Sequence, residues 1–323
     1  MFQRRTLLKG LTALPLANFA AAPVLAADYP ARRVQVLVTT APGGSSDIVT
    51  RLTCQFVSDR LGQSFLVDNR PGAGGNIAVE LAHRAPADGY TLLAIHKGMV
   101  AANSLADNLS FDFMGDFEPV AGVSNGPLLM LMHPSVPVNS LAEFIAYAKA
   151  NPSKINFASA GNGSDPHLAG ELFKMMAGVQ MTHVPYRGGA LAFTDLLGGN
   201  VQMMFTNLPA AEYIKTGKLR AIAVTTANRS KANPDIPSVA EQVPGYEVGV
   251  WFAYVMRRGA PGQAVDVVNR AVNAALADKN VQAGLAVLDS EPLPMSPTEL
   301  GKFLETETEK WARVIRTAHI KAE

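Results

Sequence analysis

The sequence predicts an α/β protein with mostly parallel sheets, arranged as two lobes behind an export signal. Three observations support this prediction: short apolar runs alternate with amphipathic helical segments, the apolar runs are nearly continuous, and the chain has 323 residues. Nearly continuous apolar strands are typical of parallel sheets that helices cover on both faces. This length, with 48% hydrophobic and 17% charged residues, suits about two domains and excludes a disordered chain.

The first 26 residues are typical of an export signal. Basic residues stand in the run Arg4-Arg5-Thr6-Leu7-Leu8-Lys9, an apolar run covers 11–22, and Val24-Leu25-Ala26 is a cleavage site. The twin arginines favour the Tat route, and Sec export stays open. The apolar run is too short for a membrane anchor, which needs about 20 residues. We therefore expect cleavage near Ala26 and a periplasmic protein.

Seven strands are predicted after the signal, with helices between them. They cover 34–38, 65–67, 91–95, 128–132, 155–159, 201–205 and 219–225, and a further strand at the hinge is expected over 246–255. Ser140 and Ser296 are each followed three residues later by Glu, a capping box that opens a helix. The helices after Gly259 have no predicted strand between them, so we expect them to cover an earlier sheet. The chain would leave the first lobe (27–124), build the second (125–219) and return (220–323).

Composition and motifs exclude several classes of protein. Cys54 is the single cysteine, which excludes an internal disulfide framework and a four-thiolate metal site. The net charge is +1, and removal of the signal leaves 25 Lys and Arg against 27 Asp and Glu, so nucleic acid is not an expected partner. The sequence has no H-x-x-x-H pair, nucleotide fingerprint or nucleophile elbow, so we expect no metal, cofactor or catalytic residue.

Two glycine-bearing loops are the candidate site. Residues 39–47 follow the strand 34–38, residues 159–167 follow the strand 155–159, and each loop precedes a helix. Glycines let backbone N–H groups turn toward a ligand, and a helix N-terminus adds partial positive charge. One such loop could be a plain turn in which Ser45 or Ser46 caps the helix. Two of them, in two lobes and at the carboxyl ends of strands, favour a small anion held between the lobes.

Five motifs, in this order, resemble one family over the whole chain after the signal. They are Pro42-Gly43-Gly44-Ser45-Ser46-Asp47, Arg70-Pro71-Gly72-Ala73-Gly74-Gly75-Asn76-Ile77, Asp88-Gly89-Tyr90-Thr91-Leu92-Leu93, His183-Val184-Pro185-Tyr186-Arg187-Gly188-Gly189 and Gly217-Lys218-Leu219-Arg220-Ala221-Ile222-Ala223-Val224-Thr225. The sequence resembles the Bug family, the extracytoplasmic solute-binding proteins of tripartite tricarboxylate transporters.

The resemblance implies a Venus-flytrap fold of the type II periplasmic-binding-protein kind, whose two lobes close over a small carboxylate. It also implies that backbone amides of the two loops hold the carboxylate. Carried over, the ligand-binding residues are Ala41, Pro42, Gly43, Gly44, Ser45, Ser46 and Asp47 from one loop, and Ser159, Ala160, Gly161, Asn162, Gly163 and Ser164 from the other. Asp47 is expected to brace its loop, because its charge would repel a carboxylate.

Three departures from the family pattern make the expected cleft more polar or more positive. Thr39-Thr40 stand where relatives carry Pro and an aromatic residue, His96-Lys97 stand where relatives carry small residues, and Thr206-Asn207 replace Asp-Asn. We expect Lys97 or His96 to meet a second anionic group, which favours a dicarboxylate or an aromatic carboxylate. Lys97 could instead be a solvated rim residue. In the next motif, Tyr186 is a better cleft residue than Arg187, although Arg187 could fork onto a carboxylate.

The sequence therefore predicts a periplasmic transport receptor, expected as a monomer, that delivers a small carboxylate to a membrane permease. Two alternatives stay open. An exported α/β enzyme acting on an organic acid would need a nucleophile and base or a metal cluster, and the sequence shows neither. A ligand sensor would present its closed form to a signalling receptor, and the sequence does not separate a sensor from a transport receptor.

Overall fold

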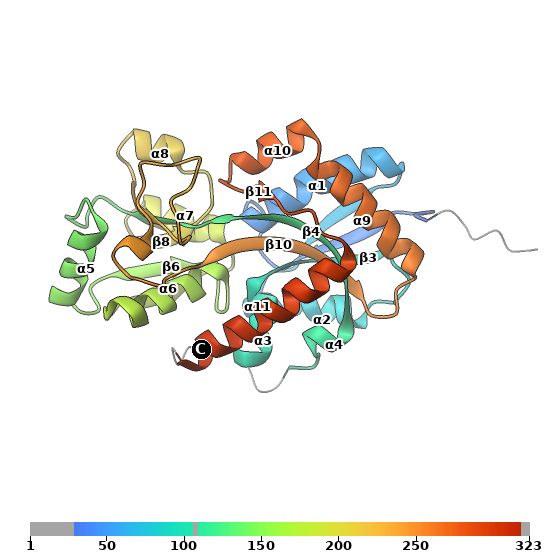
Figure 1. Cartoon of the computed structure of the whole chain (residues 1–323), viewed down its shortest axis with the longest axis horizontal. Helices are drawn as coiled ribbons and strands as arrows, with labels where there is room; N and C mark the ends of the chain where they lie inside the picture. The colour runs from blue at the N-terminus through green and yellow to red at the C-terminus, as the bar shows by residue number, and fades with distance from the viewer. Residues whose placement is uncertain (1–28, 106–108, 318–323) are drawn as a thin grey trace, which may run out of the picture.

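The computed structural model describes residues 29–105 and 109–317, and the predicted export signal lies outside them. The described residues form two lobes, each built on one sheet (Figure 1). The first sheet has the strand order β11-β4-β10-β3-β1-β2, and the second has the order β7-β6-β8-β5-β9. The predicted α/β class with two sheets is confirmed.

Each sheet draws its strands from separate parts of the chain. The first sheet contains β1 (Val34–Val38), β2 (Phe65–Asn69), β3 (Thr91–His96), β4 (Phe117–Pro127), β10 (Gly249–Arg257) and β11 (Glu291–Pro292). The second contains β5 (Leu129–Met132), β6 (Asn156–Ser159), β7 (Thr182–Pro185), β8 (Met203–Thr206) and β9 (Arg220–Val224). The chain thus leaves the first sheet after β4 and returns to it at β10.

Helices connect and cover these strands. They are α1 (Ser45–Leu61), α2 (Asn76–Arg84), α3 (Lys97–Leu105), α4 (Phe113–Asp116), α5 (Leu141–Ala150), α6 (Asp165–Ala177), α7 (Gly189–Leu197), α8 (Ala211–Lys215), α9 (Gly262–Leu276), α10 (Lys279–Ala286) and α11 (Pro297–Thr317), with 3-10 turns η1 (Ala73–Gly75) and η2 (Val239–Glu241). The predicted capping box at Ser296 forms, since the Glu299 N–H donates to Ser296 Oγ and the Ser296 N–H donates to the Glu299 carboxylate. At Ser140 only half of the box forms, because the Glu143 N–H donates to Ser140 Oγ but the Glu143 carboxylate accepts the N–H of Asn139. As expected, α9 and α11 pack on the first sheet, where they contact β4.

The sheets are mixed, so the prediction of mostly parallel sheets is wrong. Parallel pairs join β1 to β2 and β3, and β6 to β7 and β8. However, β10 is antiparallel to both β3 and β4, and β5 is antiparallel to both β8 and β9. The antiparallel pairs arise because the chain crosses between the sheets twice, in opposite directions.

Two long strands form the crossing. β4 and β10 pair along their length and run side by side from one sheet toward the other (Figure 1). The sequence analysis did not predict β4, because Ser124, Asn125 and Gly126 interrupt its apolar pattern. It also placed residue 220 onward in the first lobe, whereas β9 (Arg220–Val224) pairs with β5 in the second sheet. The strand that returns to the first sheet is therefore β10.

Candidate functional site

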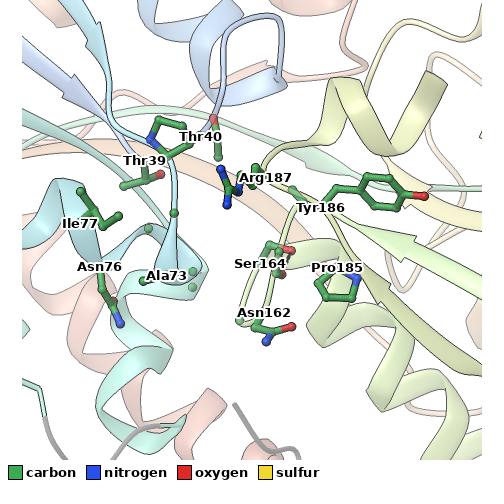
Figure 2. Close-up of a pocket in the computed structure, with 18 of the residues that line it drawn as sticks. Thr39, Thr40, Ala73, Asn76, Ile77, Asn162, Ser164, Pro185, Tyr186 and Arg187 are labelled. Atoms are coloured by element: carbon green, nitrogen blue, oxygen red, sulfur yellow. Dashed lines mark hydrogen bonds between the residues drawn. The ribbon is translucent and has the colours of Figure 1, made fainter. Parts of the chain in front are cut away.

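A cleft of about 620 Å³ lies between the two sheets, at the carboxyl ends of β1, β3, β6 and β7 (Figure 2). Loops from both lobes line this outer cleft. The first lobe contributes Thr39, Thr40, Pro71, Gly72, Ala73, Gly74, Gly75, Asn76, Ile77, His96 and Gly98, and the second contributes Ala160, Gly161, Asn162, Gly163, Ser164, Pro185, Tyr186 and Arg187. Most of this lining is glycine, alanine and small polar residues, so much of the surface facing the cleft is backbone.

A smaller compartment of about 50 Å³ adjoins the outer cleft and shares Thr40, His96, Ala160 and Ser164 with it. Its other lining residues are Gly44, Ser45, Ser46, Leu128, Asp165, Pro166, Gly189, Met204, Thr206, Asn207, Leu208, Val250 and Phe252. Since Leu128, Val250 and Phe252 belong to the buried core beside the crossing strands, this inner compartment is the floor of the site.

Several helices begin at the cleft. The N-termini of α1, α6 and α7 border the inner compartment, and those of α2 and α3 border the outer cleft. No side chain of a described residue caps α1, α2, α6 or α7 at its N-cap position. The first-turn N–H groups and the partial positive charge of each helix end are therefore available to an anion. The sequence analysis foresaw two of these helix ends, those of α1 and α6.

Unpartnered polar atoms mark the floor of the cleft. The hydroxyls of Thr39, Thr40 and Ser46 and the side-chain amide nitrogen of Asn207 are buried and make no hydrogen bond with a described residue. Ser45 Oγ donates to Asn207 Oδ1 across the two lobes at 2.5 Å, which leaves the Asn207 NH₂ group as a free donor. A buried donor without a partner costs about 1–3 kcal/mol. Thr40, Ser46 and Asn207 therefore face the inner compartment with unpartnered groups, and so does Asp165, whose Oδ1 accepts no hydrogen bond from a described residue.

Glycines let the two lobes meet at the rim of the cleft. A Cβ atom on Gly98 would lie 2.6 Å from the carbonyl oxygen of Gly163, and one on Gly74 would lie 2.7 Å from the carbonyl oxygen of Asn162. Both glycines are in the first lobe and both carbonyl groups are in the second. The backbones approach too closely here for any other residue type, so the structure has its lobes closed around the cleft.

Comparison with known proteins places this geometry in a family. A family model described as "Tripartite tricarboxylate transporter family receptor" matches residues 49–320. The chain is 36% identical to Protein BugT of Bordetella pertussis, over 93% of this chain and 94% of that protein. The chain belongs to the tripartite tricarboxylate transporter receptor family. The resemblance to Bug proteins inferred from the motifs is thereby confirmed.

Solved structures of similar proteins have the same fold. The Rhodopseudomonas palustris protein Rpa4515 with adipate shares 37% identity at a TM-score of 0.87, over 91% of this chain and 99% of that one. The periplasmic binding protein BugD shares 33% identity at a TM-score of 0.86, over 91% and 100%. MatC of the same Rhodopseudomonas species, with bound malate, shares 32% identity at a TM-score of 0.84, over 89% and 100%. These are two-lobed receptors, which confirms the expected fold.

Most of the residues carried over from the receptor family face the cleft or its inner compartment. Those that do are Thr40, Gly44, Ser45, Ser46, His96, Ala160, Gly161, Asn162, Gly163, Ser164, Tyr186, Thr206 and Asn207. Ala41, Pro42, Gly43, Asp47, Lys97 and Ser159 do not line either space. Several of these residues instead hold the lining in place.

Asp47 braces the first glycine loop, as the sequence analysis expected. Its carboxylate accepts hydrogen bonds from the Gly43 N–H, from Arg51 Nε and from Asn69 Nδ2, each at 2.9 Å. Burial raises the pKa of Asp47, but these hydrogen bonds outweigh it and hold the pKa below its ordinary value. Asp47 is thus a charged brace that leaves the helix end free for a ligand.

A pair of stacked histidines braces the second glycine loop. Ser159 Oγ lies 2.6 Å from His183 Nε2 and accepts the Gly161 N–H, while the Gly163 N–H donates to His167 Nδ1. The two imidazole rings stack with centroids 4.1 Å apart. Burial, with the charge of Lys174 nearby, lowers the pKa of His167 to about 4 and, with His167 also contributing, that of His183 to about 3. Both rings are therefore neutral at neutral pH.

Lys97 is buried behind the cleft, which contradicts both expectations for it. Its ammonium group donates to the Gly249 carbonyl, lies 3.8 Å from Asp165 Oδ1 and sits 4.6 Å from the centre of the Trp311 ring. His96 Nδ1 lies 3.5 Å from the other Asp165 oxygen. Lys97, His96 and Asp165 are 2–4% exposed, so they form a buried charge cluster. A lysine at this position was expected in solvent or at the ligand because its partner, Asp165, is distant in sequence.

Tyr186 and Arg187 both line the cleft, but their side chains extend in different directions. The Tyr186 hydroxyl donates to Asp195 at 2.5 Å, and its side chain extends away from the cleft (Figure 2). Burial and this hydrogen bond raise the pKa of Tyr186 to about 12. The Arg187 side chain instead extends toward Thr40 across the cleft (Figure 2). Tyr186 therefore borders the cleft while its hydroxyl anchors the loop, and the Arg187 side chain extends into the site.

The sequence analysis missed one wall of the cleft, residues 71–77. This loop follows β2 and includes η1 and the start of α2. It repeats the pattern of the other two loops, a strand followed by glycines and a helix, so the same reasoning would have found it. It also missed Gly189 at the start of α7, which follows β7, a strand that was not predicted.

Within residues 29–105 and 109–317, no helix is long and apolar enough to cross a membrane. In the same ranges, no group of three or more His, Cys, Asp or Glu side chains could hold a metal ion. The donors that face the cleft of this family member are hydroxyl, amide and backbone N–H groups and the Arg187 guanidinium. Such donors suit an organic anion.

Proposed function

We propose that this chain is a periplasmic receptor that captures a small organic carboxylate between its lobes and delivers it to the permease of a tripartite tricarboxylate transporter. The observation that carries the proposal is the inner compartment, where Ser46 and Asn207 present unpartnered buried donors beside three uncapped helix ends. A carboxylate would satisfy these donors, and hydrogen bonds to a charged group contribute about 1.5–3 kcal/mol each. The relatives with adipate and malate support the same ligand class.

The lobes of the proposed receptor are built on the two sheets. Residues 29–124 and the chain from β10 onward form the first lobe, and the second extends from 125 through β9. β4 and β10 join them, so closing around a ligand would bend this pair of strands. The closed form would present a composite surface to the permease. A signalling receptor would read the same surface, which makes the membrane partner the feature that separates the two roles.

An enzymatic role has one observation in its favour, the Ser159–His183 contact at 2.6 Å. A nucleophile and base need this proximity. However, Ser159 is fully buried, its hydroxyl also contacts the Gly161 backbone, and it does not line the cleft. A substrate in the cleft would not reach it. We therefore propose that the pair stabilises the loop and that the protein binds its ligand without converting it.

Calorimetry on wild type and Ser46→Ala, titrated with adipate and with malate, tests the proposal. The wild type should bind at least one of the two, and Ser46→Ala should bind it about tenfold more weakly, because one donor to the carboxylate is lost. The melting temperature of the unliganded variant should equal or exceed that of wild type, because a buried unpartnered hydroxyl has been removed.

Thr306→Ala, which removes an exposed hydroxyl from α11, is the matched control and should bind as wild type does. Unchanged affinity in Ser46→Ala would place the carboxylate elsewhere. NMR of the recovered ligand tests for conversion, and uptake by vesicles containing the permease tests for delivery.

A further inference from the structure

We propose that Arg187 recognises a second anionic group of the ligand and thereby makes the receptor select dicarboxylates over monocarboxylates. This inference rests on the proposed function, because it concerns the same cleft. It replaces Lys97, the expected second-anion contact, which the structure places in the buried charge cluster. It also names a residue that the receptor fold does not by itself assign to the ligand.

Arg187 has a positively charged side chain that no described residue neutralises. Its guanidinium makes no hydrogen bond or ion pair with any residue in the described part of the chain, although it lines the cleft and extends across it (Figure 2). Nearby basic residues differ in this respect. Arg51 is paired with Asp47, and Arg70 is paired with Asp68. Five donors in a planar fork are therefore available where a ligand would lie.

The charges of the outer cleft also point to an anion. Among the described residues that line it, Arg187 is the one Lys, Arg, Asp or Glu. His96 also faces the cleft, but burial lowers its pKa, so its ring is neutral at neutral pH. No carboxylate competes for the guanidinium within this lining. The outer cleft thus has a single positive side chain and no negative one.

The two spaces divide the recognition between them. Hydroxyl and amide donors and helix ends line the inner compartment, together with the buried carboxyl group of Asp165, which lies beside His96 and Lys97. The proposed function places one carboxylate of the ligand at these donors. A second carboxylate on the same ligand would extend into the outer cleft, where the Arg187 guanidinium can donate two charge-assisted hydrogen bonds to it. A monocarboxylate would place a methyl group there and leave the guanidinium in water.

The backbone on both sides of Arg187 is fixed, which directs its side chain into the cleft. On one side, the Tyr186 N–H donates to the Ser159 carbonyl and the Tyr186 hydroxyl donates to Asp195. On the other side, Gly188 has a φ of +145°, and a Cβ there would lie 3.0 Å from the Cβ of Ala41 in the opposite lobe. The loop is held by both lobes, so less ordering is needed when a ligand binds.

Calorimetry with a pair of ligands of equal length tests this inference. Adipate and hexanoate both have six carbons and differ in one carboxylate. Wild type should bind adipate at least about tenfold more tightly than hexanoate. Arg187→Gln should abolish most of this preference by weakening adipate binding while leaving hexanoate binding within about threefold. Added salt should weaken adipate binding more than hexanoate binding in wild type.

Two further variants complete the test. Arg187→Lys keeps the charge without the planar fork and should retain part of the preference. Arg33→Gln removes an exposed arginine outside the cleft and should behave as wild type, which controls for the change in net charge. Equal binding of both ligands by wild type, or an equal loss of both in Arg187→Gln, would overturn the inference and leave the proposed function standing. A wild type that binds no carboxylate would overturn both.

Discussion

The floor of the cleft and the buried charge cluster behind it lie next to each other but differ in how their buried polar groups are partnered. Both are buried, both draw residues from the two lobes, and His96 and Asp165 belong to both. At the floor, Ser46 and Asn207 hold donors that no described residue accepts. In the cluster, the charges of Lys97 and Asp165 meet each other, and Lys97 also meets a carbonyl group and an aromatic ring.

The difference teaches how to tell a binding surface from a structural one. Leaving donors unpartnered lowers the stability of the closed form, and a ligand that satisfies them recovers that stability. The opposite charges of the cluster attract each other and hold the lobes together, so they offer a ligand few free hydrogen-bonding groups. Substitution should therefore have opposite effects in the two regions: it should weaken ligand binding at the floor and destabilise the fold in the cluster.

The largest effect is expected from Asp165→Asn. This change leaves the Lys97 ammonium buried without its carboxylate, and removing one partner of a buried ion pair costs about 3–5 kcal/mol. Urea unfolding of the unliganded protein measures the loss. Adding Lys97→Met to Asp165→Asn should recover part of it, because the uncompensated charge is then gone.

The exposed pair of Arg229 and Glu241 provides the control, since Glu241→Gln should change stability far less. Asp165 also lines the inner compartment, so ligand affinity is measured beside stability. If Asp165→Asn kept its full stability and lost ligand affinity instead, Asp165 would act in binding rather than in the cluster, and the contrast between the two regions would fail.

A smaller effect is expected from Gly98→Ala, which should weaken adipate binding about tenfold. The added Cβ would lie 2.6 Å from the Gly163 carbonyl oxygen of the other lobe and 2.8 Å from His96 Cε1 of its own lobe, so the lobes could not close fully unless both neighbours moved. Calorimetry measures the affinity, and small-angle scattering with saturating ligand should show a larger radius of gyration than wild type. Gly262→Ala, where nothing lies within 4 Å, should match wild type in both measurements. Normal closure in Gly98→Ala would show that this contact does not limit it.

The most gradual effect concerns pH. Because the pKa values of His167 and His183 are lowered in the folded state, the unfolded chain binds more protons once the pH falls below about 6.5. The two neutral rings should contribute their full stabilisation above that pH. The free energy of unfolding should then decrease as the pH falls toward 4, and His167 should account for about 1 kcal/mol of the decrease per pH unit. NMR titration of the two imidazole rings checks this directly. A ring that titrates near pH 6.5 would contradict the described packing.

The sequence predicted the structure best where an apolar run is followed directly by glycines and a helix. β1 was predicted to the residue, and the loops after β1 and β6 were identified, because strand, glycine and helix follow one another locally. β4 was not predicted, since turn-forming residues lie inside it and its pairing with β10 is a long-range contact. The burial of Lys97 was equally hidden, because it depends on Asp165, which another lobe supplies. Local patterns predict elements, whereas partners that meet across the crossing need the structure.

The close approaches of Gly74 to Asn162 and of Gly98 to Gly163 also bear on the entropy that is lost when the lobes close. Because backbone faces backbone at these points of the rim, no side chain there loses rotational freedom when the lobes close. Little of the binding free energy of the ligand is then lost to ordering side chains at the rim of the cleft.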